Sequence, residues 1–144
     1  FSNLLNDTID RMKNKAAVNR LRIESKISPD VFINADPEKI VQVVVNILDN
    51  AIKYSYQGST IEAEMFTENN NAVFIVKDSG IGIPKEDMKN IFERFYRASN
   101  TNGITGTGLG LAISNIIIEK HKGKISIESI QNKGTSVKII IPHM

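Results

Sequence analysis

The 144-residue chain contains no cysteine, which excludes a disulfide framework and a metal site built from thiolates. No apolar run approaches the roughly 20 residues that a membrane-spanning helix needs. The first ten residues, FSNLLNDTID, lack the basic start and apolar segment of a signal peptide. The formal net charge of +2, from 18 basic and 16 acidic residues, is too small to indicate binding to nucleic acid or to a membrane surface. These absences predict a cytoplasmic piece that is not inserted in a membrane.

The length and composition fit one globular domain. With 41% hydrophobic and 24% charged residues, the chain has the usual balance of a folded protein. Hydrophobic periodicity and turn residues predict helices over 4–18, 37–54, 84–93 and 108–120, and strands over 21–27, 31–35, 60–67, 72–78, 124–130 and 135–141. This mixed order favours one sheet with helices packed on one face.

The long helix predicted over 37–54 has a polar stripe beside its apolar face. At about 100° per residue, the side chains within about 40° of Asn46 are those of Lys39, Gln42, Asn50 and Lys53, and Asp49 lies about 60° away. A solvated stripe on an amphipathic helix is one interpretation. A binding face is the other, because asparagine is a poor helix former and two asparagines stand one turn apart.

A second pattern is an apolar strand that ends in Asp78 and continues into glycines, AVFIVKDSGIGIP over residues 72–84. A turn between a strand and a helix explains glycine through positive φ. A nucleotide base lying against the turn is the alternative. The carboxylate of Asp78 can accept a hydrogen bond from the amino group of adenine, whereas guanine presents a carbonyl there and would be repelled.

A third pattern, GITGTGLGLAI over residues 103–113, has glycine at every second position from Gly106 to Gly110. A glycine-rich turn before a helix can bind anions, because unpaired N–H groups and the helix dipole point toward the ligand. The pattern is neither a P-loop, since no Gly-Lys-Ser/Thr follows, nor a dinucleotide fingerprint, whose glycines are spaced differently. Close helix packing explains the same glycines without a ligand, so both interpretations stay open.

Four motifs in this order resemble the N, G1, F and G2 boxes of sensor histidine kinases: NILDNAIKYS (46–55), DSGIGIP (78–84), IFERFYR (91–97) and GTGLGLAI (106–113). The resemblance is to their catalytic and ATP-binding domain, in the wider group that includes gyrase B, Hsp90 and MutL. It implies an α+β fold, a two-layer α/β sandwich known as the Bergerat fold, with a mixed sheet of about five strands under three main helices and an ATP lid. It also implies that residues 21–144 form this domain and that residues 1–20 are a helical tail from an upstream dimerisation and phosphoacceptor domain.

The resemblance implies ATP and Mg²⁺ as ligands and assigns the charged end of the site. Asn50 would give an oxygen to Mg²⁺, and Asn46 would support the metal and the phosphates. Lys53 and Arg97 would neutralise phosphate charge, and together with Asn46 they form the expected catalytic set. After Arg97 the stretch ASNTNGIT has no further basic residue, where many relatives have one.

The resemblance also assigns the base-binding end and the lid. Tyr54 would pack near the nucleotide, and Asp78 would accept the adenine amino group. Phe92 and Phe95 would anchor the lid on the core. The backbone expected to lie against the nucleotide is that of Gly80, Gly82, Gly106, Thr107, Gly108, Leu109 and Gly110.

Two residues narrow the reaction that the resemblance implies. Relatives that hydrolyse ATP or phosphorylate serine have Glu at position 46, whereas an asparagine side chain cannot act as a general base. The acceptor should therefore be nucleophilic at neutral pH, as a neutral imidazole is. His121, in HKGK where His-Gly-Gly is usual, is expected to end its helix as a structural residue and not to accept phosphate.

The implied function is transfer of the γ-phosphoryl group of ATP to a histidine on the upstream domain, for onward transfer to a response regulator. An anti-sigma-factor-type serine kinase and a nucleotide-binding regulatory module without catalysis are the alternatives. The isolated domain is expected to be a monomer that binds ATP and does not phosphorylate itself.

Overall fold

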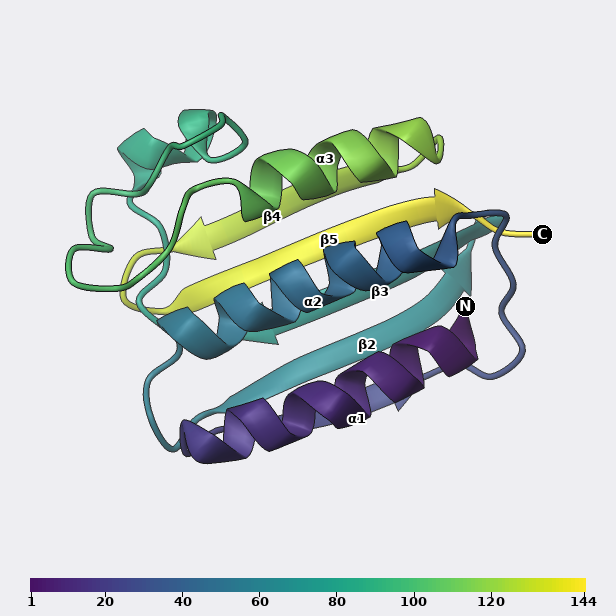
Figure 1. Ribbon diagram of the computed structural model, residues 1–144, viewed down its shortest axis with the longest axis horizontal. Helices are drawn as coiled ribbons and strands as arrows, with labels where there is room; N and C mark the ends of the chain where they lie inside the picture. Colours follow the sequence, from purple (N-terminus) through teal and green to yellow (C-terminus); the bar gives the residue numbers. More distant parts are fainter.

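The computed structural model describes residues 1–144 and has a five-stranded sheet covered on one face by helices (Figure 1). The elements are α1 (Ser2–Val18), β1 (Arg22–Ile27), α2 (Pro37–Tyr54), β2 (Thr60–Glu68), β3 (Asn71–Asp78), a 3₁₀ segment η1 (Lys85–Asn90), α3 (Gly110–Lys120), β4 (Lys124–Ile130) and β5 (Gly134–Pro142). The strand order is β1-β2-β3-β5-β4, with β1 parallel to β2 and the other neighbours antiparallel. The predicted two-layer α+β fold is confirmed.

The connections explain the mixed sheet. β1 and β2 are parallel because α2 lies between them in the chain and returns the backbone to the same end of the sheet. β2 and β3 form a hairpin, and Asn69 and Asn70 at its tip both have positive φ, at 50° and 60°. Asparagine tolerates this conformation, which the tight turns of twisted hairpins require.

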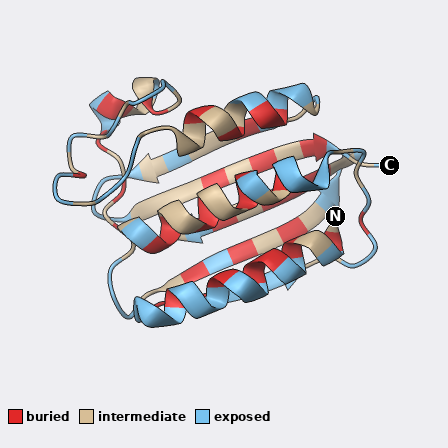
Figure 2. Cartoon of the chain, in the orientation of Figure 1, coloured by how far each residue is buried: buried red, intermediate tan, exposed pale blue.

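The orientation of α2 follows from its start and its apolar face. The side chain of Asp36 caps the helix by accepting hydrogen bonds from the backbone N–H groups of Glu38 and Lys39, at 3.0 and 3.2 Å. Its buried residues face the sheet (Figure 2), and they are Ile40, Val43, Val44, Ile47, Leu48, Ala51 and Ile52. The polar stripe with Asn46 is consequently turned away from the sheet, toward the space beside α3.

Helix α1 belongs to the same hydrophobic core as the sheet. It packs on α2 and β1, and its core residues are Leu5, Ile9, Met12 and Ala16. Residues 1–20 therefore pack against the predicted domain of residues 21–144 instead of projecting from it as a free tail. Their attachment to an upstream dimerisation domain stays a prediction.

Three predicted elements differ from the structure. Residues 31–35 form no strand, only an isolated bridge between Ile33 and His143, because the backbone of Val31 is bonded to the start of α1. The helix predicted over 84–93 is the short η1, followed by a chain reversal at Phe95, where φ is 64°. The helix predicted from residue 108 begins at Gly110, because Gly108 has a φ of 74°.

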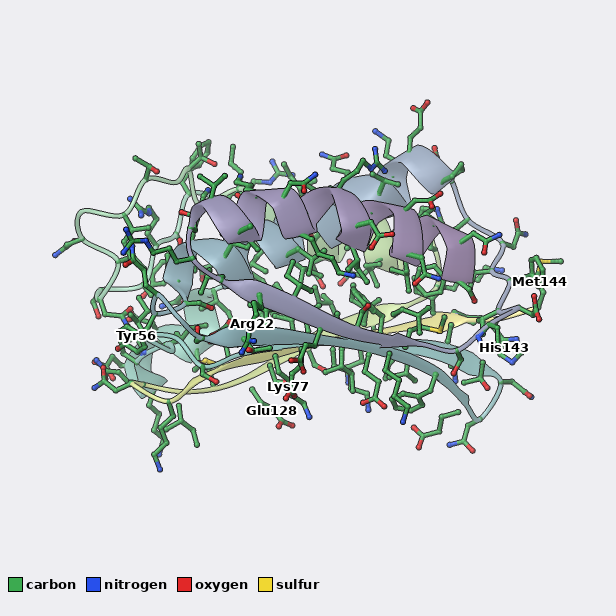
Figure 3. All side chains as sticks on the ribbon, turned by 90° about the horizontal axis from the view of Figure 1, so that it is seen from below. Arg22, Tyr56, Lys77, Glu128, His143 and Met144 are labelled. Carbon is green, nitrogen blue, oxygen red and sulfur yellow. The ribbon has the colours of Figure 1, made fainter.

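The face of the sheet opposite the helices is largely polar. The side chains of Lys77 and Glu128 project from it, away from the helices (Figure 3). None of the helices combines the length and the apolar character needed to cross a membrane.

Candidate functional site

A cavity of about 390 Å³ lies between α2, α3, the end of β3 and the segment from Ile91 to Leu109, which we call the lid. Its volume is in the range of small-molecule sites. Of the predicted site residues all but Gly80 line it, namely Asn46, Asn50, Lys53, Tyr54, Asp78, Gly82, Arg97, Gly106, Thr107, Gly108, Leu109 and Gly110. The fold thus brings together residues from four separate motifs.

Asp78 has one satisfied and one free carboxylate oxygen. Oδ1 accepts hydrogen bonds from the backbone N–H groups of Gly80, at 2.9 Å, and Thr135, at 3.3 Å, whereas Oδ2 has no partner in the protein. Burial raises the pKa of Asp78 above its ordinary value, although the two N–H groups act in the opposite direction. A half-buried carboxylate held rigidly at a cavity wall, with an oxygen left over, is suited to accept a hydrogen bond from a ligand.

The glycines after Asp78 are required by the protein's own backbone. A Cβ on Gly80 would lie 2.0 Å from the carbonyl oxygen of Tyr54, and one on Gly82 would lie 2.1 Å from that of Ile130. The turn is held between these segments, because Ile81 N–H donates to the Tyr54 carbonyl at 3.0 Å. Close approach of backbone, rather than of a base, explains why residues 80 and 82 lack side chains.

Gly106, Gly108 and Gly110 fall into two classes. Gly108 has positive φ, and a Cβ added to it would lie 2.7 Å from the backbone of Phe95. Its carbonyl accepts a hydrogen bond from Phe95 N–H at 3.0 Å, and this bond joins the two ends of the lid. By contrast, Cβ atoms on Gly106 and Gly110 would meet nothing closer than 3.8 and 3.7 Å, and neither residue has positive φ. Nothing in the protein itself requires glycine at 106 and 110, so these two leave room for a ligand.

This difference predicts opposite effects for two alanine substitutions. Gly80→Ala should destabilise the fold by about 2 kcal/mol or more, because its Cβ would overlap a fixed backbone carbonyl. Gly106→Ala should leave the melting temperature unchanged and weaken binding of ATP. Thermal melts and calorimetric titration of both variants test the pair, and a Gly106→Ala protein with unchanged ATP affinity would contradict the phosphate assignment.

The polar stripe of α2 faces the cavity. Asn46 Nδ2 donates to the backbone carbonyl of Gly110 at 3.3 Å and to Ser114 Oγ at 3.4 Å, and so joins α2 to the first turn of α3. The side chain of Asn50, one turn later, has no hydrogen-bond partner in the protein. Lys53 Nζ forms an ion pair with Asp49 Oδ2 at 3.0 Å. This placement favours the binding-face interpretation of the stripe over a solvated one.

Arg97 is held by the lid. Its Nη2 donates to the carbonyls of Thr101, at 3.4 Å, and Ile104. The guanidinium group and the Tyr54 hydroxyl both lie 3.8 Å from the position of a Cβ on Gly106. Two polar groups from different elements therefore flank the open backbone at Gly106.

The sequence did not reveal the contacts that fasten the first part of the lid. The buried carboxylate of Asp87 in η1 accepts hydrogen bonds from the Tyr96 hydroxyl, from Ser99 N–H at 2.9 Å and from Ser99 Oγ at 2.8 Å. These bonds, that of Tyr96 first, hold the pKa of Asp87 below its ordinary value. Asn100 Nδ2 donates to the Gly82 carbonyl at 2.9 Å. No spacing rule identifies such a tertiary cluster.

Three residues around the lid and α3 bear on earlier predictions. Phe92 packs against the core, whereas Phe95 is 73% exposed, so the prediction that Phe95 anchors the lid is wrong. Its backbone, not its ring, makes the contact with Gly108. His121 ends α3, with Nδ1 bonded to the Ile117 carbonyl at 2.8 Å and Nε2 accepting from Asp36 N–H at 3.0 Å, which confirms a structural role.

Residues 35–144 match the model of a protein family described as histidine kinase-, DNA gyrase B-, and HSP90-like ATPase. The chain belongs to this family. The resemblance to the catalytic and ATP-binding domain of sensor histidine kinases is thereby confirmed, and membership of this family implies that the domain binds ATP.

Known relatives agree with this membership. The chain is 42% identical to the sensor histidine kinase WalK of Bacillus subtilis (strain 168) over 79% of its length, and 38% identical to WalK of Staphylococcus haemolyticus (strain JCSC1435) over 99%. It spans only 19% and 24% of these relatives. Among solved structures, the mycobacterial sensor histidine kinase MprB matches 98% of the chain, with 94% of its own chain covered, a TM-score of 0.88 and 27% identity.

Proposed function

We propose that this domain binds ATP with Mg²⁺ and transfers the γ-phosphoryl group to a histidine on an upstream dimerisation domain of the same kinase. A response regulator receiver domain would then take the group. The domain would act on the cytoplasmic side and be a monomer when isolated. The main support is one cavity lined both by the carboxylate of Asp78, which has an oxygen free to accept a hydrogen bond, and by amide, ammonium and guanidinium groups.

The residues of α2 and the lid suit a polyphosphate. Phosphoryl transfer depends chiefly on positioning and on neutralising charge. Lys53 and Arg97 carry the positive charges that line the cavity, and Arg97 would exchange its bonds to lid carbonyls for phosphate oxygens. A Cβ at Gly106 or Gly110 would meet no protein atom closer than 3.7 Å, so the phosphates could approach the backbone there. Together these groups would orient the phosphates and shield them from water.

The free amide of Asn50 fits a magnesium ligand. Mg²⁺ prefers oxygen ligands, keeps several waters and is usually held by one or two protein groups plus phosphate oxygens. The structure has no group of three or more His, Cys, Asp or Glu side chains placed to hold a metal. Asn50, with Asn46 beside it, would hold the ion, which supplies additional neutralisation of phosphate charge when bound.

The absence of a carboxylate at position 46 supports histidine as the acceptor. The amide of Asn46 is bonded to the start of α3 and has no basic group to take a proton from a hydroxyl. A neutral imidazole needs no such base. His121 is not a candidate acceptor, because both of its ring nitrogens are engaged in the fold.

The decisive experiment is phosphotransfer in trans. The domain is incubated with γ-labelled ATP and a full-length parent kinase that carries Asp78→Asn, and the label is followed through acid treatment. Acid-labile label on the parent, and none on the domain alone, is expected. Acid-stable label would indicate the serine kinase alternative, and binding of ATP without any transfer would indicate the regulatory module.

A further inference from the structure

Asp49 on the polar stripe of α2 is contacted by lysines from two helices. Its Oδ2 pairs with Lys53, one turn along α2, at 3.0 Å, and its Oδ1 accepts a hydrogen bond from Lys15 of α1. The Asp49 side chain is 19% exposed, against 33% for Lys53 and 52% for Lys15. Asp49 and Lys53 line the ATP cavity, and Lys15 does not.

A carboxylate in this position works against the binding of phosphates. It repels them, and it competes with them for the ammonium group of Lys53. The carboxylate contacts two ammonium groups, those of Lys15 and Lys53, and these balance its negative charge within the protein.

We propose that Lys15 is a positioning residue for ATP binding, which neutralises Asp49 and so leaves Lys53 available to the phosphates. This inference rests on the proposed phosphate role of Lys53. Without Lys15, the carboxylate of Asp49 has Lys53 as its only partner and draws it away from the ligand. With Lys15 in place, Asp49 still holds the ammonium group of Lys53 beside the cavity. The negative charge of Asp49 is then shared between two ammonium groups, so Lys53 is held less tightly.

The arrangement makes the phosphate end of the site depend on α1. Lys15 reaches Asp49 across the contact between α1 and α2, 34 residues away in the sequence. A displacement of α1 along α2 would separate the two groups and change the charge beside the cavity. Helix α1 thus carries a means of tuning nucleotide affinity from outside the site.

An ion pair that contributes only to stability is the competing explanation, since exposed pairs are commonly worth little. The two explanations differ in what they predict for different ligands. If the ion pair contributes only to stability, its loss lowers the melting temperature and leaves the affinity for each nucleotide as in the wild type. A positioning role affects ligands with β- and γ-phosphates and spares adenosine.

The test is calorimetric titration of Lys15→Met, with Lys13→Met as the matched control. Lys13 is on the same helix and pairs at 3.1 Å with Asp10, and neither residue lines the cavity. Lys15→Met should weaken ATP and ADP binding about threefold to fivefold, the size of one partly exposed charge interaction. Adenosine affinity should not change, and Lys13→Met should leave all three affinities as in the wild type.

A double-mutant cycle isolates the path through Asp49. In an Asp49→Asn background, Lys15→Met should have no effect on ATP affinity, because no carboxylate remains to be neutralised. An equal loss in both backgrounds, an equal loss for adenosine, or no loss at all would each overturn the proposal. Lys15→Gln serves as a second variant, and thermal melts verify that each variant is folded. If the wild-type domain bound no ATP, the proposed function would be wrong, and this result is distinct from a wild type that binds ATP and a Lys15→Met variant that binds it equally well.

Discussion

Replacing Asp78 by asparagine is expected to weaken ATP binding by about 100-fold, because it sets an amide N–H₂ group against the amino group of adenine. In the wild type, Oδ1 is fixed by Gly80 and Thr135, whereas Oδ2 has no partner in the protein and would accept the hydrogen bond from adenine. The asparagine oxygen can keep the two backbone bonds, so its nitrogen takes the place of Oδ2. Calorimetric titration with ATP measures the loss.

Titration with GTP is the internal control for Asp78→Asn. Guanine presents a carbonyl where adenine presents its amino group, so the new N–H₂ group of the variant becomes a suitable donor for it. The preference for ATP over GTP should therefore shrink or reverse. Equal affinity of wild type and variant for ATP would show that Asp78 does not contact the base.

The same substitution should leave the fold as stable as before or more so. The pKa of Asp78 is raised in the folded state, so the folded protein holds this proton to higher pH than the unfolded chain does. Stability from this group is then present at low pH and is lost as the pH rises through the raised pKa. At neutral pH the charged carboxylate lowers the free energy of unfolding, and Asp78→Asn removes this charge. The variant is therefore expected to melt at pH 7 at the same temperature as the wild type or higher, and thermal melts of both proteins test this.

Asn50→Ala is expected to lower phosphotransfer by about 1,000-fold, the order of effect seen when a group that stabilises transition-state charge is removed. Asn50 has a free amide at the cavity and no structural hydrogen bond to lose, so the melting temperature should change little. ATP affinity measured without Mg²⁺ should stay as in the wild type. The strengthening of ATP binding by Mg²⁺ should disappear.

Gln42→Ala is a suitable control for Asn50→Ala. Gln42 carries an amide on the same polar stripe, two turns nearer the start of α2, and lines the same cavity. Its removal should change transfer by less than about twofold. If Asn50→Ala retained the full response to Mg²⁺, the metal would have to be held by other groups, and the assignment to Asn50 would be withdrawn.

Caps, turns and hydrophobic periodicity predicted most of the helices and strands, because each of these patterns depends only on neighbouring residues. The cap at Asp36 and Pro37 marks the start of α2, and periodicity assigns its apolar face. The polar stripe, the carboxylate at the end of β3 and the glycines before α3 each left two interpretations open. Their order along the chain resembled one family, and that family is confirmed.

Tertiary contacts decided what the local patterns left open. Glycine is needed at 80, 82 and 108 because backbone from distant segments approaches those residues, whereas 106 and 110 stay open to the cavity. Phe95 is exposed, although it occupies an apolar position in its motif, because the chain reverses there.

The sequence by itself determined most element types and their apolar faces, because helix and strand periodicity and turn chemistry depend on residues a few positions apart. The resemblance of its four motifs to one family supplied the expected site residues, and all of them but Gly80 line the cavity. Only the folded chain could pair Lys15 with Asp49 or Tyr96 with Asp87. Such pairs depend on how two elements pack against each other. Packing is set by the whole core, and no short stretch of sequence specifies it.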